Sequence, residues 1–271
     1  MIKFADMNIL EQTIQAIREA SSLMVSPGEG FSIEQKGGLE NIVTSSDIAV
    51  QKRLCESLER ILPGCGFICE ENDVFDPDKE FVWIIDPIDG TANYARGWGE
   101  CAISVALTQG TDILMGIIYS PGRNELYYAE KGKGAFCNGK RITTSDRTFE
   151  DGILCSALST YRKQFSGVCS DIIMDTYRQC NDIRRFGAAS VEFGFLAKGL
   201  CELYFEIRLQ PWDYAAGILL IREAGGVITN LDGDQPSFSG PDLVCAANNA
   251  GNHARLLGII RSHLATLPYT D

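Results

Sequence analysis

The sequence predicts a mixed fold, with an α+β first half and an α/β second half that pack as one unit. Short β-rich segments separated by turn residues fill the middle third of the 271-residue chain. After about residue 145, strand and helix patterns alternate instead. No repeat, low-complexity tract or flexible linker separates the halves. We therefore expect an N-terminal lobe over residues 1–145, a C-terminal lobe over residues 146–271 and an active site between them.

Two helices and a set of antiparallel strands are expected in the first half. Apolar residues at helical spacing within residues 5–25 predict the first helix, and a second helical pattern over residues 48–61 ends at Pro63-Gly64. Strands are predicted at residues 66–69, 81–85, 102–109, 113–119 and 125–129, with hairpin turns at 110–112 and 121–124. Pro87 should end the strand that begins at residue 81, because proline cannot donate to a strand ladder.

Strands and helices are expected to alternate in the second half. The strands are predicted at residues 153–157, 182–186, 202–207, near 227–228 and at 243–246. The helices are predicted at about residues 165–180, 189–198, 212–224 and 249–264.

The charge of the chain limits its partners. A formal net charge of −12 argues against bulk binding to nucleic acid or to an anionic membrane. A phosphorylated substrate remains possible, because a divalent metal can supply local positive charge. The N-terminus lacks a signal-peptide pattern, no apolar run spans a bilayer, and ten scattered cysteines form no CxxC pair. We expect a cytoplasmic protein with reduced cysteines and no nucleic-acid or membrane partner.

The segment from Trp83 to Thr91 carries the strongest functional signal. An apolar run ends in Asp86-Pro-Ile-Asp-Gly-Thr, which places two carboxylates three residues apart at the end of a strand. Gly90 and Thr91 follow where a helix could begin. Carboxylates are hard ligands that suit Mg²⁺, and the N–H groups of a helix start suit a phosphate. The alternative is an Asx-type turn with solvated aspartates.

Further acidic residues stand at the ends of other predicted elements. Taken alone, Asp213 fits a helix cap, Glu70 a solvated strand end and Asp47 the N-cap of the second helix. Together they could share one cleft. The oxygen donors that could bind two or three Mg²⁺ ions are Glu70, Asp86, the Ile88 carbonyl, Asp89 and Asp213. Without metal such a cluster repels itself, which predicts partial disorder or protonation.

The combination resembles the inositol monophosphatase family of Mg²⁺-dependent, lithium-sensitive phosphatases. Residues 86–91 match D-P-[IL]-D-G-T, and residues 212–217 match W-D-x-[AST]-[AG]-[AG]. The resemblance covers residues 9–264. Supporting matches are Lys36, residues 41–47, Glu70-Glu71, residues 187–189, Glu206 and residues 224–226. It implies a layered αβαβα sandwich, usually a homodimer, that acts as a phosphoric monoester hydrolase.

The resemblance also implies a role for each matching residue. Glu70, Asp86 and the Ile88 carbonyl would hold one Mg²⁺; Asp86, Asp89 and Asp213 would hold a second; and a third, weaker ion would bind near Glu70. The catalytic residues would be Glu70, Thr91 with Asp47 behind it, and Lys36. The substrate would be bound by Asp89, Gly90, Thr91, Gly187, Ala188, Ala189, Glu206 and Asp213, with the phosphate on the N–H groups of Gly90 and Thr91.

Several substrates stay open. The sequence D-G-T-A-N-Y at residues 89–94 favours myo-inositol monophosphate, since relatives that act on inositol often read D-G-T-x-N-[FY]. Relatives that cleave 3'-phosphoadenosine 5'-phosphate tend to read D-G-T-K-E-F, and histidinol phosphate is a further possibility. Fructose-1,6-bisphosphatase activity needs a second phosphate pocket, for which the candidates are Arg162, Lys163, Arg184, Arg185 and Arg208. Solvated surface charge is the alternative for these five. A non-catalytic binding or regulatory protein is the alternative of another class.

Overall fold

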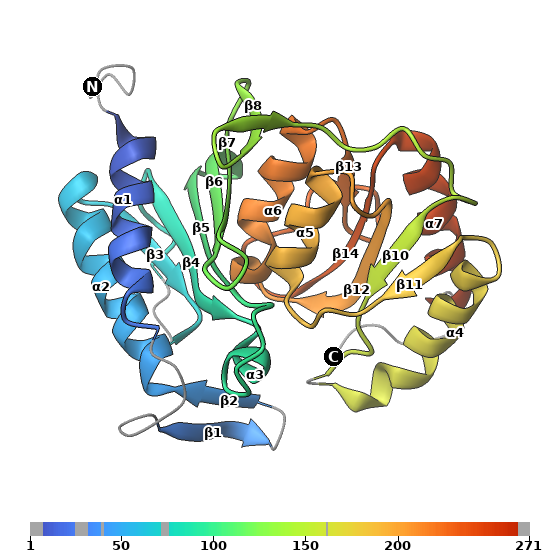
Figure 1. Cartoon of the computed structure of the whole chain (residues 1–271), viewed down its shortest axis with the longest axis horizontal. Helices are drawn as coiled ribbons and strands as arrows, with labels where there is room; N and C mark the ends of the chain where they lie inside the picture. Colours follow the sequence, from blue (N-terminus) through green and yellow to red (C-terminus); the bar gives the residue numbers. More distant parts are fainter. Residues whose placement is uncertain (1–7, 25–31, 39–40, 72–75, 161, 265–271) are drawn as a thin grey trace.

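Two sheets and three helical layers alternate in the computed structural model, which describes residues 8–24, 32–38, 41–71, 76–160 and 162–264 (Figure 1). The outer helices α1 (Ile9–Ser21) and α2 (Ser45–Ile61) cover a seven-stranded sheet. Helices α5 (Ala189–Ala197) and α6 (Pro211–Glu223) lie between that sheet and a five-stranded sheet. Helices α4 (Ser166–Tyr177) and α7 (Ala250–Leu264) cover the far side. This is the expected layered αβαβα sandwich.

The seven-stranded sheet follows the chain from one edge to the other. Its strands, in spatial order, are β3 (Gly66–Cys69), β4 (Val82–Asp89), β5 (Ala102–Gln109), β6 (Asp112–Ser120), β7 (Glu125–Glu130), β8 (Gly134–Cys137) and β9 (Lys140–Ile142). The pairs from β4 to β9 are antiparallel, as expected. The pair β3–β4 is parallel. The expected antiparallel meander is therefore wrong at this edge, where a long connection lets the chain re-enter the sheet in the same direction.

The expectation that Pro87 ends its strand is also wrong. Strand β4 continues through Pro87 to Asp89 and stays paired with β5. The pairing register between β4 and β5 shifts between Asp86 and Asp89. Pro87 lies in this irregularity, where the pairing with β5 does not require a backbone N–H donor. The shift brings both aspartates to the end of a strand that is buried along its whole length.

The five-stranded sheet belongs to the second half of the chain. Its strands, in spatial order, are β11 (Asp182–Arg184), β10 (Ile153–Ser156), β12 (Leu203–Leu209), β14 (Asp242–Ala247) and β13 (Val227–Thr229). Strand β10 runs parallel to both neighbours, whereas β14 runs antiparallel to both of its own. All nine residues of α5 are buried, because this helix has a neighbour on every side.

Glycines in α5 and α6 let the helix backbones of the middle layer pack directly against neighbouring side chains. A Cβ added to Gly217 of α6 would lie 2.4 Å from Cδ2 of Phe193 in α5. A Cβ on Gly194 would lie 2.9 Å from the ring of Tyr127 in β7. Both positions therefore need glycine if the helices are to pack at this distance.

The remaining elements are short. They are β1 (Ile33–Gly38), β2 (Asn41–Thr44), α3 (Thr91–Tyr94) and a 3₁₀ turn at Lys163–Phe165. Strands β1 and β2 form a two-stranded sheet of their own, which Figure 1 places beside α3. Among the helices that the structure describes, none is long and apolar enough to cross a membrane.

Candidate active site

Three carboxylates from distant parts of the sequence converge. Asp86 and Asp89 lie at the end of β4, and Asp213 lies in the first turn of α6. One carboxylate oxygen from each lies within 4.8 Å of the other two. The rigid end of a buried strand and the start of a buried helix thus hold the cluster in place.

Asp86 is the most deeply buried of the three, with 1% of its surface exposed. Its Oδ1 accepts the backbone N–H of Ile88 at 2.9 Å. Burial raises its pKa well above the ordinary value, and repulsion from Glu70, Asp89 and Asp213 raises it further. Glu70 follows β3 directly, and its backbone N–H donates to the Ile85 carbonyl at 3.2 Å. The end of the parallel neighbour β3 therefore brings this fourth carboxylate to the cluster.

Asp89 is held by the first turn of α5. The backbone N–H of Ser190 donates to its Oδ2 at 2.7 Å, and the Ser190 hydroxyl donates to the same oxygen. Burial raises the pKa of Asp89 to about 6, while the bonds from Ser190 and from the N–H groups of Ala189 and Gly90 oppose the rise. Hydrogen bonds thus stabilise the charged form of Asp89 more than that of Asp86.

Asp213 has a structural role as well as a place in the cluster. Its Oδ2 accepts the backbone N–H of Gln210 at 2.7 Å, which closes a capping box at the start of α6. Asp213 thus helps to cap α6 as the third helical residue, although the N-cap position itself is held by Gln210. Burial, and next the charge of Asp89, raise the pKa of Asp213 well above its usual range.

A hydroxyl and a buried carboxylate stand beside the cluster. The Thr91 hydroxyl lies 2.9 Å from the Ile88 carbonyl and 3.3 Å from Oδ1 of Asp47, and can donate to either. Asp47 is fully buried and accepts the backbone N–H of Thr44 at 2.9 Å. It is the third residue of α2, whose N-cap is Thr44, so Asp47 is not the N-cap itself.

The loop before α5 packs against the turn that follows β4. Gly90 has φ +82°, and a Cβ there would lie 2.9 Å from the Cβ of Ala188 and 2.9 Å from the Glu100 carbonyl. The Asn93 amide donates to the carbonyls of Glu100 and Phe186 at 2.8 and 2.7 Å. Residues 187–189 thereby lie next to Gly90, and the resemblance alone implies a role for them in substrate binding.

Glu206 faces the cluster from β12 of the other sheet. Its Oε2 accepts the Tyr204 hydroxyl at 3.0 Å. Burial raises the pKa of Glu206 to about 7, the bond from Tyr204 opposes this, and the charge of Asp89 adds to it. A carboxyl group near half-protonation can both accept and donate hydrogen bonds to hydroxyl groups.

With this geometry established, comparison with known proteins decides the family. The model of the family described as "Inositol monophosphatase family" matches residues 2–265. The chain belongs to the inositol monophosphatase family. It is therefore a phosphatase, and both the predicted family and the predicted enzyme class are confirmed.

Individual relatives agree with that assignment. The chain is 34% identical to the inositol-1-monophosphatase of Caulobacter vibrioides, over 92% of this chain and 99% of the relative. It is 33% identical to the Nus factor SuhB of Escherichia coli, over 83% of this chain and 86% of the relative. The solved extragenic suppressor protein suhB from Bartonella henselae superposes with a TM-score of 0.86 at 29% identity, covering 93% of this chain and 98% of that one.

The residues of this inositol monophosphatase homologue fit a divalent cation. All donors of the cluster are oxygens, the ligand type that Mg²⁺ prefers. The raised pKa values of Asp86, Asp89 and Asp213 identify buried carboxylates that repel each other when no cation neutralises them. A cation placed among them removes that repulsion and restores their charged form.

Two residues of this site were missed by the sequence reasoning. Ser190, which binds Asp89, gives no local signal, because its partner lies 101 residues away. Glu192 is 2% exposed, and its Oε1 accepts the N–H groups of Phe186 and Gly187 at 2.7 and 3.2 Å. Burial raises its pKa to about 8, although these two bonds oppose the rise. One acidic residue within the apolar run of residues 189–197 is the signal that could have revealed it.

Some predicted residues are not joined to the cluster. Lys36 lies in β1, and its side chain is outside the described part of the chain. Among the candidate phosphate-binding cations, Arg184 pairs with Asp182, and Arg185 donates to the Thr160 hydroxyl at 3.1 Å. The charge of Arg185 lowers the pKa of Glu206 slightly, although burial and the charge of Asp89 dominate and raise it, so Arg185 lies near Glu206.

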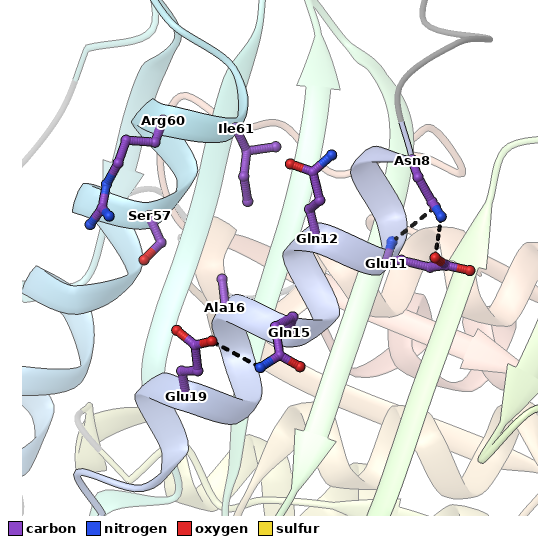
Figure 2. A pocket seen from close by; sticks show the side chains of 9 residues that line it. All are labelled: Asn8, Glu11, Gln12, Gln15, Ala16, Glu19, Ser57, Arg60 and Ile61. Carbon is purple, nitrogen blue, oxygen red and sulfur yellow. Dashed lines mark hydrogen bonds between the residues drawn. The ribbon is translucent and has the colours of Figure 1, made fainter.

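A groove of about 410 Å³ lies on the outer layer, between α1 and α2 (Figure 2). Seven of its nine lining residues are polar, and two of them, Gln15 and Glu19, hydrogen-bond to each other at 2.8 Å. The helices α1 and α2 cover the seven-stranded sheet from the side opposite α6, so this groove is separate from the carboxylate cluster.

Proposed function

We propose that this phosphatase hydrolyses myo-inositol monophosphate to inositol and phosphate, with Mg²⁺ and an activated water. The convergence of Asp86, Asp89 and Asp213 within 4.8 Å carries the proposal. Glu70, Asp86 and the Ile88 carbonyl would hold one ion, and Asp86, Asp89 and Asp213 a second, with a third near Glu70. Mg²⁺ bound there lowers the pKa of water and neutralises charge on the phosphoryl group.

The protein groups beside the cluster prepare the attacking water. The Thr91 hydroxyl donates to the Ile88 carbonyl or to Asp47, so its lone pairs can accept a hydrogen bond from that water and orient it. Asp47 accepts hydrogen bonds from Thr44 and so stays oriented towards Thr91. Glu70, at the edge of the cluster, is the proposed base. Lys36 remains a proposed catalytic residue on the basis of the family pattern alone.

The substrate is proposed to lie between the turn at Gly90 and strand β12. The N–H groups of Gly90 and Thr91 would receive the phosphate, with Gly187, Ala188 and Ala189 beside them. Asp89, Ala189 and Glu206 would contact the hydroxyl groups of the alcohol, and Asp213 would border the same site. Glu206, with a pKa of about 7, suits a polyol because it can accept or donate hydrogen bonds.

Other features belong to the same proposal. We propose inhibition by Li⁺, a homodimer, a cytoplasmic location, and no nucleic-acid or membrane partner. The E. coli relative carries the name of a Nus factor, which keeps a regulatory role as the alternative of another class. Fructose 1,6-bisphosphate is the second candidate substrate. Arg185 lies near enough to lower the pKa of Glu206, so its positive charge could bind a second phosphate there.

The test is phosphate release with Mg²⁺, with and without Li⁺. The substrates compared are inositol 1-phosphate, fructose 1,6-bisphosphate, 3'-phosphoadenosine 5'-phosphate and histidinol phosphate. We expect inositol 1-phosphate to be preferred and Li⁺ to inhibit. Asp89→Asn and Asp213→Asn should abolish or strongly reduce release with the fold intact, whereas the exposed Asp171→Asn should match the wild type. A wild type that releases phosphate from none of the four would favour the regulatory alternative.

A further inference from the structure

Two cysteine sulfurs lie against each other next to the carboxylate cluster. Cys55 is in α2, and Cys69 is the last residue of β3. Their Sγ atoms are 3.8 Å apart. A disulfide needs an S–S distance of about 2.0 Å, so the atoms must approach by roughly 1.8 Å. Rotation of side chains with a small backbone adjustment covers such a distance.

The surrounding hydrogen bonds hold the two backbones in register. The Gln51 amide, one turn before Cys55, donates to the Glu71 carbonyl at 2.7 Å. The Glu71 N–H donates back to Oε1 of Gln51 at 2.9 Å. Helix α2 and the segment after β3 are therefore already joined at this point, and the two thiols face each other as a result.

We propose that Cys55 and Cys69 form a modification site that a hydroperoxide oxidises to an intrachain disulfide. With hydrogen peroxide as the oxidant, the Cys55 sulfur attacks one peroxide oxygen, the O–O bond breaks, and the departing hydroxide takes up the proton of the Cys55 thiol to become water. The Cys69 sulfur then attacks the sulfur of the Cys55 sulfenic acid, the S–O bond breaks, and the hydroxide leaves with the Cys69 proton as a second water. Two thiols lose two electrons, and both peroxide oxygens are reduced.

The surroundings of the two thiols set their order of reaction. Cys55 is only partly buried, whereas Cys69 has 2% of its surface exposed. A hydrogen bond from Cys69 lowers the pKa of the Cys55 thiol, and burial opposes this to a smaller extent. The thiolate is the form that reacts with peroxide, so Cys55 is the attacking group and Cys69 the resolving one.

The disulfide would act on the active site through Glu70. Cys69 precedes Glu70 directly, and the Glu70 N–H is bonded to the Ile85 carbonyl at the end of β4. Strand β3 is the edge of its sheet and pairs with β4 alone, so a displacement of Cys69 is opposed by one strand ladder and is passed directly to Glu70. This part rests on the proposed function of Glu70 as a metal-binding residue. Oxidation should therefore raise the Mg²⁺ concentration needed for phosphate release about tenfold. Loss of a group that orients a metal ligand typically has an effect of this size.

The first measurement is independent of activity. The full-length protein is treated with hydrogen peroxide, free thiols are alkylated, and peptides are identified by mass spectrometry. A cross-linked peptide that contains residues 55 and 69 is expected, and dithiothreitol should remove it. Cys55→Ser should prevent it. Cys155→Ser is the matched control, because Cys155 and Cys201 form another contacting pair but both are buried. Alkylated Cys55 and Cys69 after peroxide treatment would overturn the proposal.

The second measurement follows phosphate release against Mg²⁺ concentration before and after oxidation. Oxidised wild type should need about tenfold more Mg²⁺, dithiothreitol should reverse this, and Cys55→Ser should be insensitive to peroxide. A disulfide that forms without changing the Mg²⁺ response would disprove the link to Glu70. If even the reduced wild type releases no phosphate, the proposed function has failed, while the cross-linked peptide still decides whether the modification site exists.

Discussion

Gly90 is the residue where β4 turns into α3, and no other residue type fits there. It has φ +82°, and a Cβ would meet Ala188 and the Glu100 carbonyl at 2.9 Å. We predict that Gly90→Ala lowers the free energy of unfolding by about 2 kcal/mol or more, through strain and overpacking, and reduces phosphate release. Urea unfolding and an activity assay would measure both effects.

Gly97→Ala is the matched control for backbone strain. Gly97 has φ +75° but a Cβ there would find no atom within 4 Å. This variant should lose only about 1 kcal/mol, the cost of the left-handed conformation alone. Equal losses in the two variants would show that the contact of Gly90 with Ala188 contributes nothing.

The clustered carboxylates predict how metal and protons compete. Burial raises the pKa of Asp89 to about 6 and those of Asp86 and Asp213 well above normal. The folded metal-free protein then binds more protons than the unfolded chain, so its stability falls as the pH rises from the ordinary carboxyl pKa through 6. Mg²⁺ replaces those protons. We predict that Mg²⁺ raises the thermal midpoint of chelator-treated protein more at pH 8 than at pH 6.

Differential scanning calorimetry with and without Mg²⁺ at the two pH values is the measurement. Asp213→Asn should shrink the Mg²⁺ effect at pH 8, and Asp171→Asn should leave it unchanged. A Mg²⁺ effect of equal size at both pH values would contradict the protonation of the metal-free cluster.

At the scale of elements, the start of α5 depends on Glu192. Its carboxyl oxygen accepts both Phe186 and Gly187 N–H groups, which hold the loop that reaches Gly90. Because burial raises the pKa of Glu192 to about 8, its charged form is disfavoured in the folded state. Protonated Glu192 therefore contributes to the free energy of unfolding. This contribution is complete below the ordinary carboxyl pKa and is lost as the pH rises through about 8.

Two substitutions separate the charge of Glu192 from its hydrogen bonds. Glu192→Gln keeps an acceptor and removes the charge, so we predict a flatter pH dependence of stability between pH 5 and 8 and near-normal activity. Glu192→Ala leaves two N–H groups without their acceptor and should cost about 2 to 5 kcal/mol. Denaturant unfolding across pH would measure this, and similar behaviour of both variants would refute the hydrogen-bonding role.

Elements with a strong local pattern could be predicted from the sequence, and others could not. The bounds of β3 and β5 match the expectation, because the apolar run of β3 ends at the charged pair Glu70-Glu71 and that of β5 ends before Gly110. The sequence patterns predict none of the strands β1, β2, β8 and β9, since segments such as Lys140–Ile142 are too short and too polar to show a period. The continuation of β4 past Pro87 depends on pairing with β5, which local sequence does not encode.

The carboxylate cluster was predictable for a different reason. Each of Asp86, Asp89 and Asp213 stands in a short motif, and the combination of motifs pointed to a shared site. The donors that support them are set by tertiary packing. Ser190 reaches Asp89 only because α5 lies between the two sheets. No spacing rule within one segment could have revealed that contact.

At the scale of the whole molecule, the middle layer ties the two halves of the sequence together. Helix α6, from residues 211–223, packs against β5 and β6 of the first half, and α5 contacts the same strands. The core around Tyr127 and Phe193 is therefore shared between residues before and after position 145. A sheet face deprived of these helices would expose a large apolar surface to water.

We therefore predict that residues 1–145 do not fold alone, although they contain all seven strands of one sheet. Expressed separately, this fragment should bind a hydrophobic dye and unfold without a cooperative transition, because α5 and α6 no longer cover β5 and β6. The full-length chain, measured in parallel by circular dichroism and dye fluorescence, should show one cooperative transition and little dye binding. A fragment with a sharp transition of its own would show that the boundary at residue 145 separates two independently stable domains, and that the middle layer is an interface rather than a common core.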